Sequence, residues 1–368
     1  MSLDQEIKVA RRTIVTDGYE MSMGELINLY KNEELKIDPV FQRLFRWDES
    51  RKTRFIESIL LGIPIPPIFV FQDESGIWEL VDGLQSVSTL LQFSGNLKNG
   101  TGEAIQSLVL SGTKLLPSLE GKRWIASSKK ANDGIGSSLQ IDIKRARLRV
   151  EILKKESDSQ AKFELFQRLN TGGVSLTEQE VRNSIAVMIN KEFFDWLVSC
   201  SKFEEFVKTT AQTPDAIEAQ AGVELVLRFL AFRNIPYSKG LDVHEYLDDA
   251  LYKLAQPGSL NLASETKVFQ NTFRELDLAL GESAFKRWDG STFKGKFLIS
   301  VFEVMATGVS SNIKAIMKMT QAKRKSHLIS RAKDLWNDPV FTSNSGAGVR
   351  GTTRLSNLLP LAKQFLKP

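Results

Sequence analysis

The hydrophobic pattern of this chain changes once, near residue 155, and that change limits the fold to two dissimilar parts. Before it, stretches of alternating apolar residues such as Arg147–Leu153 stand among helical stretches, as in a domain of mixed sheet and helix. After it, apolar residues recur almost only at helical spacing, as from Val223 to Phe232. At 368 residues the chain is long enough for two domains. We therefore expect an α+β domain over residues 1–155 and a mostly helical domain over residues 156–368.

Composition excludes several classes of protein. Hydrophobic residues make up 42% and charged residues 25%, which is typical of a folded, soluble protein. A single cysteine, Cys200, excludes an internal disulfide and a cysteine-based metal cluster, and its apolar neighbours indicate an inert, buried thiol. With only two histidines we expect neither a histidine-rich metal centre nor an HNH-type nuclease within the chain. The N-terminal residues lack the continuous apolar core of a signal peptide, and no apolar run approaches the length that spans a bilayer, so we expect a cytoplasmic protein without a membrane partner.

The first 155 residues contain a helix–strand alternation that ends on an Asp-Gly pair. Residues 66–71 and 78–81 are rich in strand-forming residues and are separated by turn residues, which predicts a hairpin. The remaining expected helices lie over 24–32, over 85–93, and after the cap-competent Asp48-Glu49-Ser50, with helical spacing from Phe55 to Leu60. We also expect an extended stretch over 36–41, loops over 96–102 and 127–138, and strands over 141–143 and 147–153. Asp82-Gly83 thus falls between a strand and a helix, where unpaired backbone N–H groups favour an anion.

Three segments carry residues suited to phosphate chemistry. In the first, Gln42, Arg43 and Arg46 precede Trp47; arginine matches phosphate oxygens and an indole stacks on a base. The alternative is that Trp47 is a core aromatic and both arginines form surface pairs.

The second segment runs through Asp82, Gly83, Gln85, Ser86 and Ser88. A short acid suits a metal ion, a ribose or the activation of water, Gly83 allows a close approach of the backbone, and Gln85 can orient a water. The alternative is an ordinary turn and helix start, capped by Asp82 or Ser86.

In the third segment, Thr171-Gly172-Gly173 ends one helix and Thr177 with Glu180 begins the next. One interpretation is a structural helix–turn–helix. The other is that Arg168, Asn170, Arg182 and Asn183 converge on a ligand.

Basic residues cluster twice, although the net charge of the whole chain is only +5. The clusters are Lys144, Arg145 and Arg147, and Lys323, Arg324 and Lys325. Either they are solvated faces or they contact nucleic acid.

The order and wording of the three segments resemble the N-terminal domain of GmrSD-type, modification-dependent restriction proteins, a ParB/sulfiredoxin-like domain. The resemblance covers roughly residues 20–235. Residues that match its motifs are Gln42, Arg43 and Trp47; Asp82, Gly83 and Gln85; and Asn170, Thr171, Gly172, Gly173, Leu176, Glu180 and Asn183.

This resemblance implies a ParB/sulfiredoxin-like fold, nucleotide binding and NTP hydrolysis, with DNA nicking in some members, in anti-phage defence. It implies Asp82 and Gln85 at the hydrolytic centre and Arg43 on phosphate. The wider nucleotide-binding set that we expect is Gln42, Arg43, Arg46, Trp47, Gly83, Ser86, Ser88, Arg168, Asn170, Thr171, Arg182 and Asn183. The implied ligands are an NTP, with Mg²⁺ as the candidate ion, and DNA; a separately encoded nuclease is a candidate partner, and self-assembly is left open.

The chain departs from the family pattern at Ser86, where the family has arginine. That change removes a charge-assisted hydrogen bond worth about 1.5–3 kcal/mol. Either another arginine (Arg43, Arg46 or Arg168) substitutes, or the site binds weakly. An alternative function is therefore a non-catalytic module that senses a nucleotide or modified DNA and regulates a separate nuclease.

Overall fold

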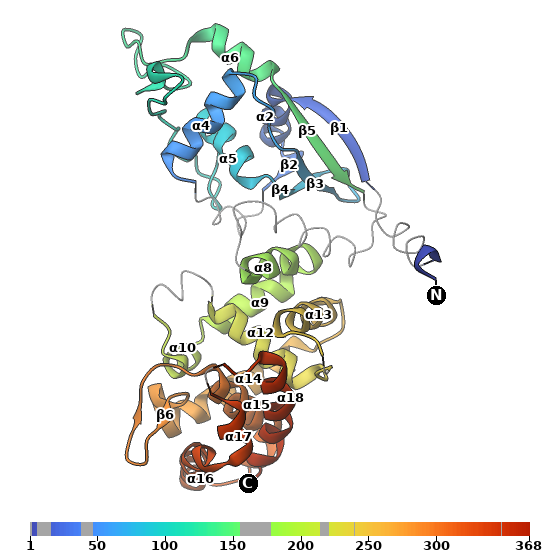
Figure 1. Ribbon diagram of the computed structural model, residues 1–368, viewed down its shortest axis with the longest axis vertical. Coiled ribbons are helices and arrows are strands. Elements are labelled where there is room, and N and C mark those ends of the chain that lie inside the picture. Colours follow the sequence, from blue (N-terminus) through green and yellow to red (C-terminus); the bar gives the residue numbers. More distant parts are fainter. Residues whose placement is uncertain are drawn as a thin grey trace. The chain divides into compact units, whose positions relative to one another are not determined.

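The computed structural model describes residues 2–5, 16–37, 47–154, 178–213, 221–238, 240–346 and 348–368. The chain divides into two compact units, Met1–Ser175 and Leu176–Pro368. The expected boundary at residue 155 lies outside the described residues, as does the one between the two units. Figure 1 shows the chain coloured from the N-terminus to the C-terminus.

The first unit is built on a five-stranded mixed sheet with the order β1-β5-β3-β4-β2. Its strands are β1 (Thr16–Ser22), β2 (Leu35–Lys36), β3 (Ile68–Gln72), β4 (Trp78–Asp82) and β5 (Arg147–Leu153). The expected hairpin is confirmed, because β3 pairs antiparallel with β4, while β3 and β5 run parallel. On β5, buried Leu148 and Val150 alternate with exposed arginines, so one face of the sheet is covered and the other meets solvent.

The covered face carries the helices of this unit, α2 (Met23–Lys31), α4 (Glu49–Leu60), α5 (Leu84–Phe93) and α6 (Gly136–Arg145) (Figure 1). Two of them start on a side-chain cap. Ser22 accepts a hydrogen bond from the N–H of Glu25, and Asp48 accepts one from Arg51. The helix expected after Asp48-Glu49-Ser50 is therefore confirmed, and the structure identifies Asp48 as the residue of the three that caps it.

One expectation for the first unit is corrected, and another is tested only in part. Residues 141–143, expected as a strand, lie in α6, because the run of alternation is short and only Ile143 of this helix is fully buried. Of the extended stretch expected over residues 36–41, Lys36 belongs to the two-residue strand β2 (Leu35–Lys36), and residues 38–41 lie outside the described residues, so this expectation stays a prediction. The structure shows a mixed α+β unit, and the ParB/sulfiredoxin-like fold stays a prediction.

The second unit is helical, as expected, apart from one short hairpin. Its helices are α8 (Glu178–Ile189), α9 (Lys191–Ser201), α10 (Glu204–Thr210), α12 (Ala221–Asn234), α13 (Val243–Ala255), α14 (Leu262–Leu280), α15 (Ile299–Ile316), α16 (Gln321–Asp334), α17 (Pro339–Asn344) and α18 (Gly351–Phe365). The hairpin joins β6 (Arg287–Trp288) to β7 (Phe293–Lys294), and the sequence pattern did not indicate it. Three 3₁₀ turns complete the described elements: Pro117–Leu119 in the first unit, and Gly281–Ser283 and Leu335–Asn337 in the second.

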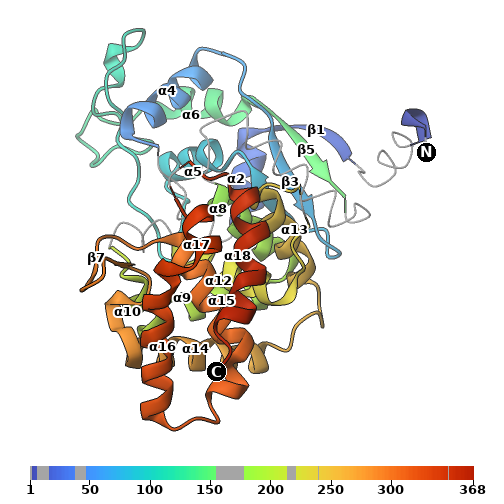
Figure 2. The same cartoon turned by 60° about the horizontal axis from the view of Figure 1, so that its bottom comes forward.

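Phenylalanine builds the centre of the helical unit. Phe206, Phe229 and Phe273 of α10, α12 and α14 pack with ring centroids 4.8–5.6 Å apart, and Phe302 of α15 stacks on Phe273. The quadrupole of the aromatic rings favours edge-on and tilted arrangements of this kind. Helices α12 and α15 are therefore buried nearly all round, and Figure 2 shows both inside the helical unit.

Across the described ranges, none of the helices is long and apolar enough to cross a membrane.

Candidate functional site

The Asp82 site is formed where strand β4 passes into helix α5, and Gly83 makes the turn. Gly83 has φ +93°, a backbone conformation that other residues adopt only with strain. A Cβ atom on Gly83 would lie 2.4 Å from Cγ2 of Ile68, well inside any normal contact distance. The neighbouring strand also shifts register between Phe69 and Val70. Local packing therefore requires glycine here, and the close approach fixes Asp82 against β3.

Asp82 is half-buried at the end of β4. Its Oδ1 accepts a hydrogen bond of 2.7 Å from the N–H of Gly83. Burial raises the pKa of Asp82 above its ordinary value, against the opposing effect of that bond. A carboxylate with a raised pKa is a better proton acceptor at neutral pH than an exposed one. The N-cap of α5 is Gly83, which has no side chain to accept an N–H from the first helical turn.

Gln85 joins the first and second segments. Its Oε1 accepts a hydrogen bond of 3.1 Å from the backbone N–H of Trp47, which fixes the amide in one orientation. The Trp47 ring packs edge-on against Phe55 of α4, with centroids 5.9 Å apart. The start of α4 and the start of α5 are thereby brought together at the Asp82 site.

Two buried polar atoms near Gln85 have no protein partner. Within the described part of the chain, Nε1 of Trp47 and Oγ of Ser88 are enclosed and form no hydrogen bond. Buried polar atoms without partners are uncommon in folded proteins and call for an explanation. A bound ligand or ordered water that hydrogen-bonds to them would supply one.

Lys52 links the two helices that begin at this site, and the sequence did not single it out. Its Nζ donates to Oε1 of Gln92 at 3.0 Å, which links α4 to α5 two turns beyond Gln85. Burial lowers the pKa of Lys52. The available signal was helical spacing, since Gln85 and Gln92 are seven residues apart and share a face of α5.

Several predicted site residues lie outside the described residues. They are Gln42, Arg43, Arg46, Arg168, Asn170 and Thr171, together with the Thr177 cap.

Arg182 and Asn183 are described, and both are buried in the helical unit. Arg182 is 1% exposed and donates to Glu224, Asp248 and Gln179, each at 3.1 Å. Asn183 accepts a hydrogen bond of 2.6 Å from Gln179. A phosphate bound by Arg182 would have to replace two carboxylate partners. The ligand-binding roles of these two residues stay predictions.

Arg182 is the first cation of a buried ladder of alternating charges. Glu224 lies between Arg182 and Arg228, at 3.1 Å and 2.7 Å, and Glu303 lies between Arg228 and Arg354, at 3.6 Å and 2.8 Å. The ladder crosses α8, α12, α15 and α18. Its sequence signal was the pair Glu224 and Arg228, spaced by four residues in an otherwise apolar helix.

The two basic clusters differ in their surroundings. Lys144, Arg145 and Arg147 are all exposed, and Nζ of Lys144 lies 5.8 Å from the ring centre of Trp124. In the second cluster Lys323 and Lys325 are exposed, but Arg324 donates to Glu275 at 2.8 Å and to the carbonyl of Met319. The second cluster therefore has only two exposed charges.

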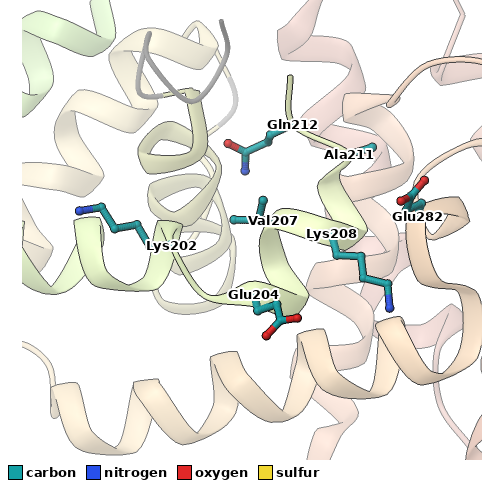
Figure 3. A pocket seen from close by; sticks show the side chains of 7 residues that line it. All are labelled: Lys202, Glu204, Val207, Lys208, Ala211, Gln212 and Glu282. Carbon is teal, nitrogen blue, oxygen red and sulfur yellow. The ribbon is translucent and has the colours of Figure 1, made fainter. Parts of the chain in front are cut away.

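A surface hollow of about 500 Å³ lies in the helical unit, at the end of α9 and along α10. Figure 3 shows Val207 and Gln212 at this hollow, with Lys202 extending away from them. Lys208 on its edge is ion-paired with Asp277 at 2.8 Å. None of the predicted site residues that the structure describes lines it, and its mixed charges favour no ligand class.

Comparison with known families decides how the Asp82 site is interpreted. Residues 23–187 match the family model of the GmrSD restriction endonuclease, N-terminal domain. Residues 23–187 are therefore similar to the GmrSD N-terminal domain. The match covers β3, β4 and the Asp82 site and ends within α8, and it confirms the resemblance drawn from the three segments. A GmrSD domain indicates a hydrolase-type protein of restriction and anti-phage defence that acts on DNA. No curated protein matches the chain.

Proposed function

We propose that the Asp82 site binds a nucleoside triphosphate and hydrolyses it, as part of a DNA-directed restriction activity that includes nicking. One observation carries the proposal: a half-buried carboxylate with a raised pKa lies at the N-terminus of a ten-residue helix, on a turn that only glycine accommodates. The match over residues 23–187 supports the same function.

In this proposal the helix start, Asp82 and Gln85 have separate roles. The N–H groups at the start of α5 and the helix dipole favour the phosphate chain. Asp82 accepts a proton from the attacking water, for which its raised pKa suits it. Gln85, held by Trp47, orients that water.

A divalent cation fits this site only in part. Within the residues that the structure describes, no group of three or more His, Cys, Asp or Glu side chains is placed to hold a metal ion. Mg²⁺ usually takes one or two carboxylates together with the phosphates of its nucleotide. Because a bound cation would lower the pKa of Asp82, which serves here as the proton acceptor, Mg²⁺ would be held mainly by the phosphates of the nucleotide and would neutralise their charge.

The test compares phosphate release by the wild type, Asp82→Asn and Asp73→Asn, with several NTPs and Mg²⁺. Asp73 is a matched control, because its carboxylate caps the β3–β4 turn through Ser75 and Ile77. We expect Asp82→Asn to lose at least about 100-fold in rate, as for a general base, and Asp73→Asn to retain it. Equal release by wild type and Asp82→Asn would refute the proposal.

Ser86 supports the second candidate function, a sensing module that regulates a separate nuclease. It occupies the family's arginine position and offers no guanidinium to a phosphate. The variant Ser86→Arg separates the two functions. A large gain in hydrolysis or nicking would show that the natural site senses its ligand without efficient turnover, and an unchanged rate would favour an active site that never used that arginine.

A further inference from the structure

The net charge of the chain is concentrated in one short segment of the first unit. Residues 121–145 contain six basic and two acidic side chains, a net charge of +4, whereas the whole chain carries +5. The basic residues are Lys122, Arg123, Lys129, Lys130, Lys144 and Arg145. Such local concentration, and not a large total charge, is typical of surfaces that bind polyanions.

The loop in this segment is fixed against α6. Trp124 is buried, packs edge-on against Phe93 at 5.5 Å, and its carbonyl accepts a hydrogen bond from Nε2 of Gln140 on α6. The N–H of Arg123 donates to the carbonyl of Asp133, and the N–H of Ile135 donates back to Arg123. Figure 1 shows this loop beside α6. The basic side chains are therefore presented by an ordered surface.

The outward side of this surface combines cations with isolated apolar side chains. Lys129, Lys130, Lys144 and Arg145 are exposed, Ile125 is 72% exposed and Ile141 is 44% exposed. Asp133 is tied to the loop, because its carboxylate accepts the N–H of Ser127 and lies 3.5 Å from Arg123. Asp142 is the exposed acid among these residues.

We propose that this α6 surface, residues 122–130 with Ile141, Lys144 and Arg145, docks duplex DNA through its phosphate backbone. The four exposed cations bind phosphates, and Ile125 lies against the groove between them as an apolar side chain. The proposal rests on the DNA-directed part of the proposed function, but not on nucleotide hydrolysis. It extends the Lys144–Arg147 cluster to a loop that the sequence did not single out.

Charge and shape favour DNA over an anionic membrane. Membrane-surface helices present a continuous apolar face opposite a charged one. Here Ile125 lies on the loop, and the two exposed apolar residues of the helix, Leu139 and Ile141, are two positions apart and so point to different sides of α6. Separate apolar side chains within a basic field match a duplex.

The experiment measures binding of the full chain to a fluorescent 30-base-pair duplex across a salt series, without nucleotide. The test variant is Lys129→Gln, Lys130→Gln, Lys144→Gln and Arg145→Gln together. Its matched control changes four exposed lysines of the helical unit that lie outside both basic clusters, Lys253, Lys267, Lys314 and Lys318, to glutamine, with the same reduction in charge. All eight positions are exposed, and a far-UV spectrum confirms that both variants are folded.

We expect the test variant to bind the duplex at least about tenfold more weakly. The slope of log affinity against log salt concentration should become shallower by about 0.9 for each phosphate that the protein no longer neutralises. The control should change neither quantity substantially. Ile125→Ala should weaken binding and leave the slope unchanged, because this side chain is uncharged. Equal reductions in affinity in the test and control variants, or an unchanged test variant, would overturn the proposal.

Two further arms separate this proposal from others. Asp82→Asn should bind the duplex like the wild type, so a failure of the proposed hydrolysis leaves this result intact.

Flotation with phosphatidylserine vesicles tests the competing partner. Wild-type protein that floats with vesicles but does not bind the duplex at the same salt concentration would assign the surface to a membrane instead, and would overturn the DNA proposal.

Discussion

Replacing Gly83 by alanine should destabilise the first unit and displace the start of α5. Two separate costs follow from the structure. The backbone at φ +93° is unfavourable for any residue with a Cβ, by about 1–2 kcal/mol. The new methyl group would also lie 2.4 Å from Cγ2 and 2.9 Å from Cβ of Ile68, a buried strand residue. Overpacking of this kind costs about 1–3 kcal/mol. The expected total is about 2–5 kcal/mol.

Gly62 provides the matched control. Its φ is +68°, but a Cβ there would meet no atom within 4 Å, so Gly62→Ala incurs only the backbone cost. The difference between the two variants therefore measures the collision with Ile68, and we expect about 1–3 kcal/mol. Gly83→Ala should also lower hydrolysis, whereas Gly62→Ala should not.

Hydrogen exchange with mass spectrometry is the suitable assay, because a two-unit chain need not unfold in one step. Peptides that cover β4 and α5 report the free energy of opening at the site. Peptides from α12 and α15 in the other unit serve as an internal reference. If Gly83→Ala costs no more than Gly62→Ala, the close packing of Gly83 on Ile68 does not constrain the site.

Three further predictions follow from buried ionisable groups. Asp82→Asn should raise the midpoint of unfolding at neutral pH. Burial raises the pKa of Asp82, so the stability conferred by its protonated form is present below the unfolded pKa and lost as pH rises through the folded pKa. Asparagine is neutral at every pH and avoids that loss. A pH series should show the gain fading towards acid; a gain that grows there contradicts it. Arg354→Met should lower the free energy of urea unfolding by about 3–5 kcal/mol, because it removes an ion-pair partner of the fully buried Glu303. Adding Glu303→Gln should restore most of that free energy. Burial raises the pKa of Cys200 to about 12, so a thiol reagent should modify it only after unfolding.

The sequence predicted the elements with strong local signals. The β3–β4 hairpin, the Asp48 cap and the strand-to-helix junction at Asp82 each depend on residues within a few positions of one another. Helix α6 was missed because most of it is exposed, so burial imposed no helical period on residues 141–143. Local sequence signals could not predict the order of the strands either, because β5 lies far along the chain from β1 and β3, between which it pairs.

The candidate site was predicted by position more than by its hydrogen bonds. The sequence placed Asp82 and Gln85 at a helix start, but the bond from Trp47 to Gln85 joins residues 38 positions apart. Arg182 shows most clearly what a local sequence pattern cannot predict. Its position in the third segment suggested a bound ligand. In the structure it is ion-paired with Glu224 and Asp248, which lie on helices that the local pattern does not connect to it.

The buried ladder restricts how this chain can be divided or recombined. The family match runs to residue 187, but α8 within it belongs to the compact unit that begins at Leu176. A chimera joining residues 1–187 to a foreign C-terminal half would leave Arg182 without Glu224 and Asp248, a buried guanidinium with no counter-ion. A workable junction must therefore precede residue 178, so that α8 is inherited with the half whose carboxylates neutralise it.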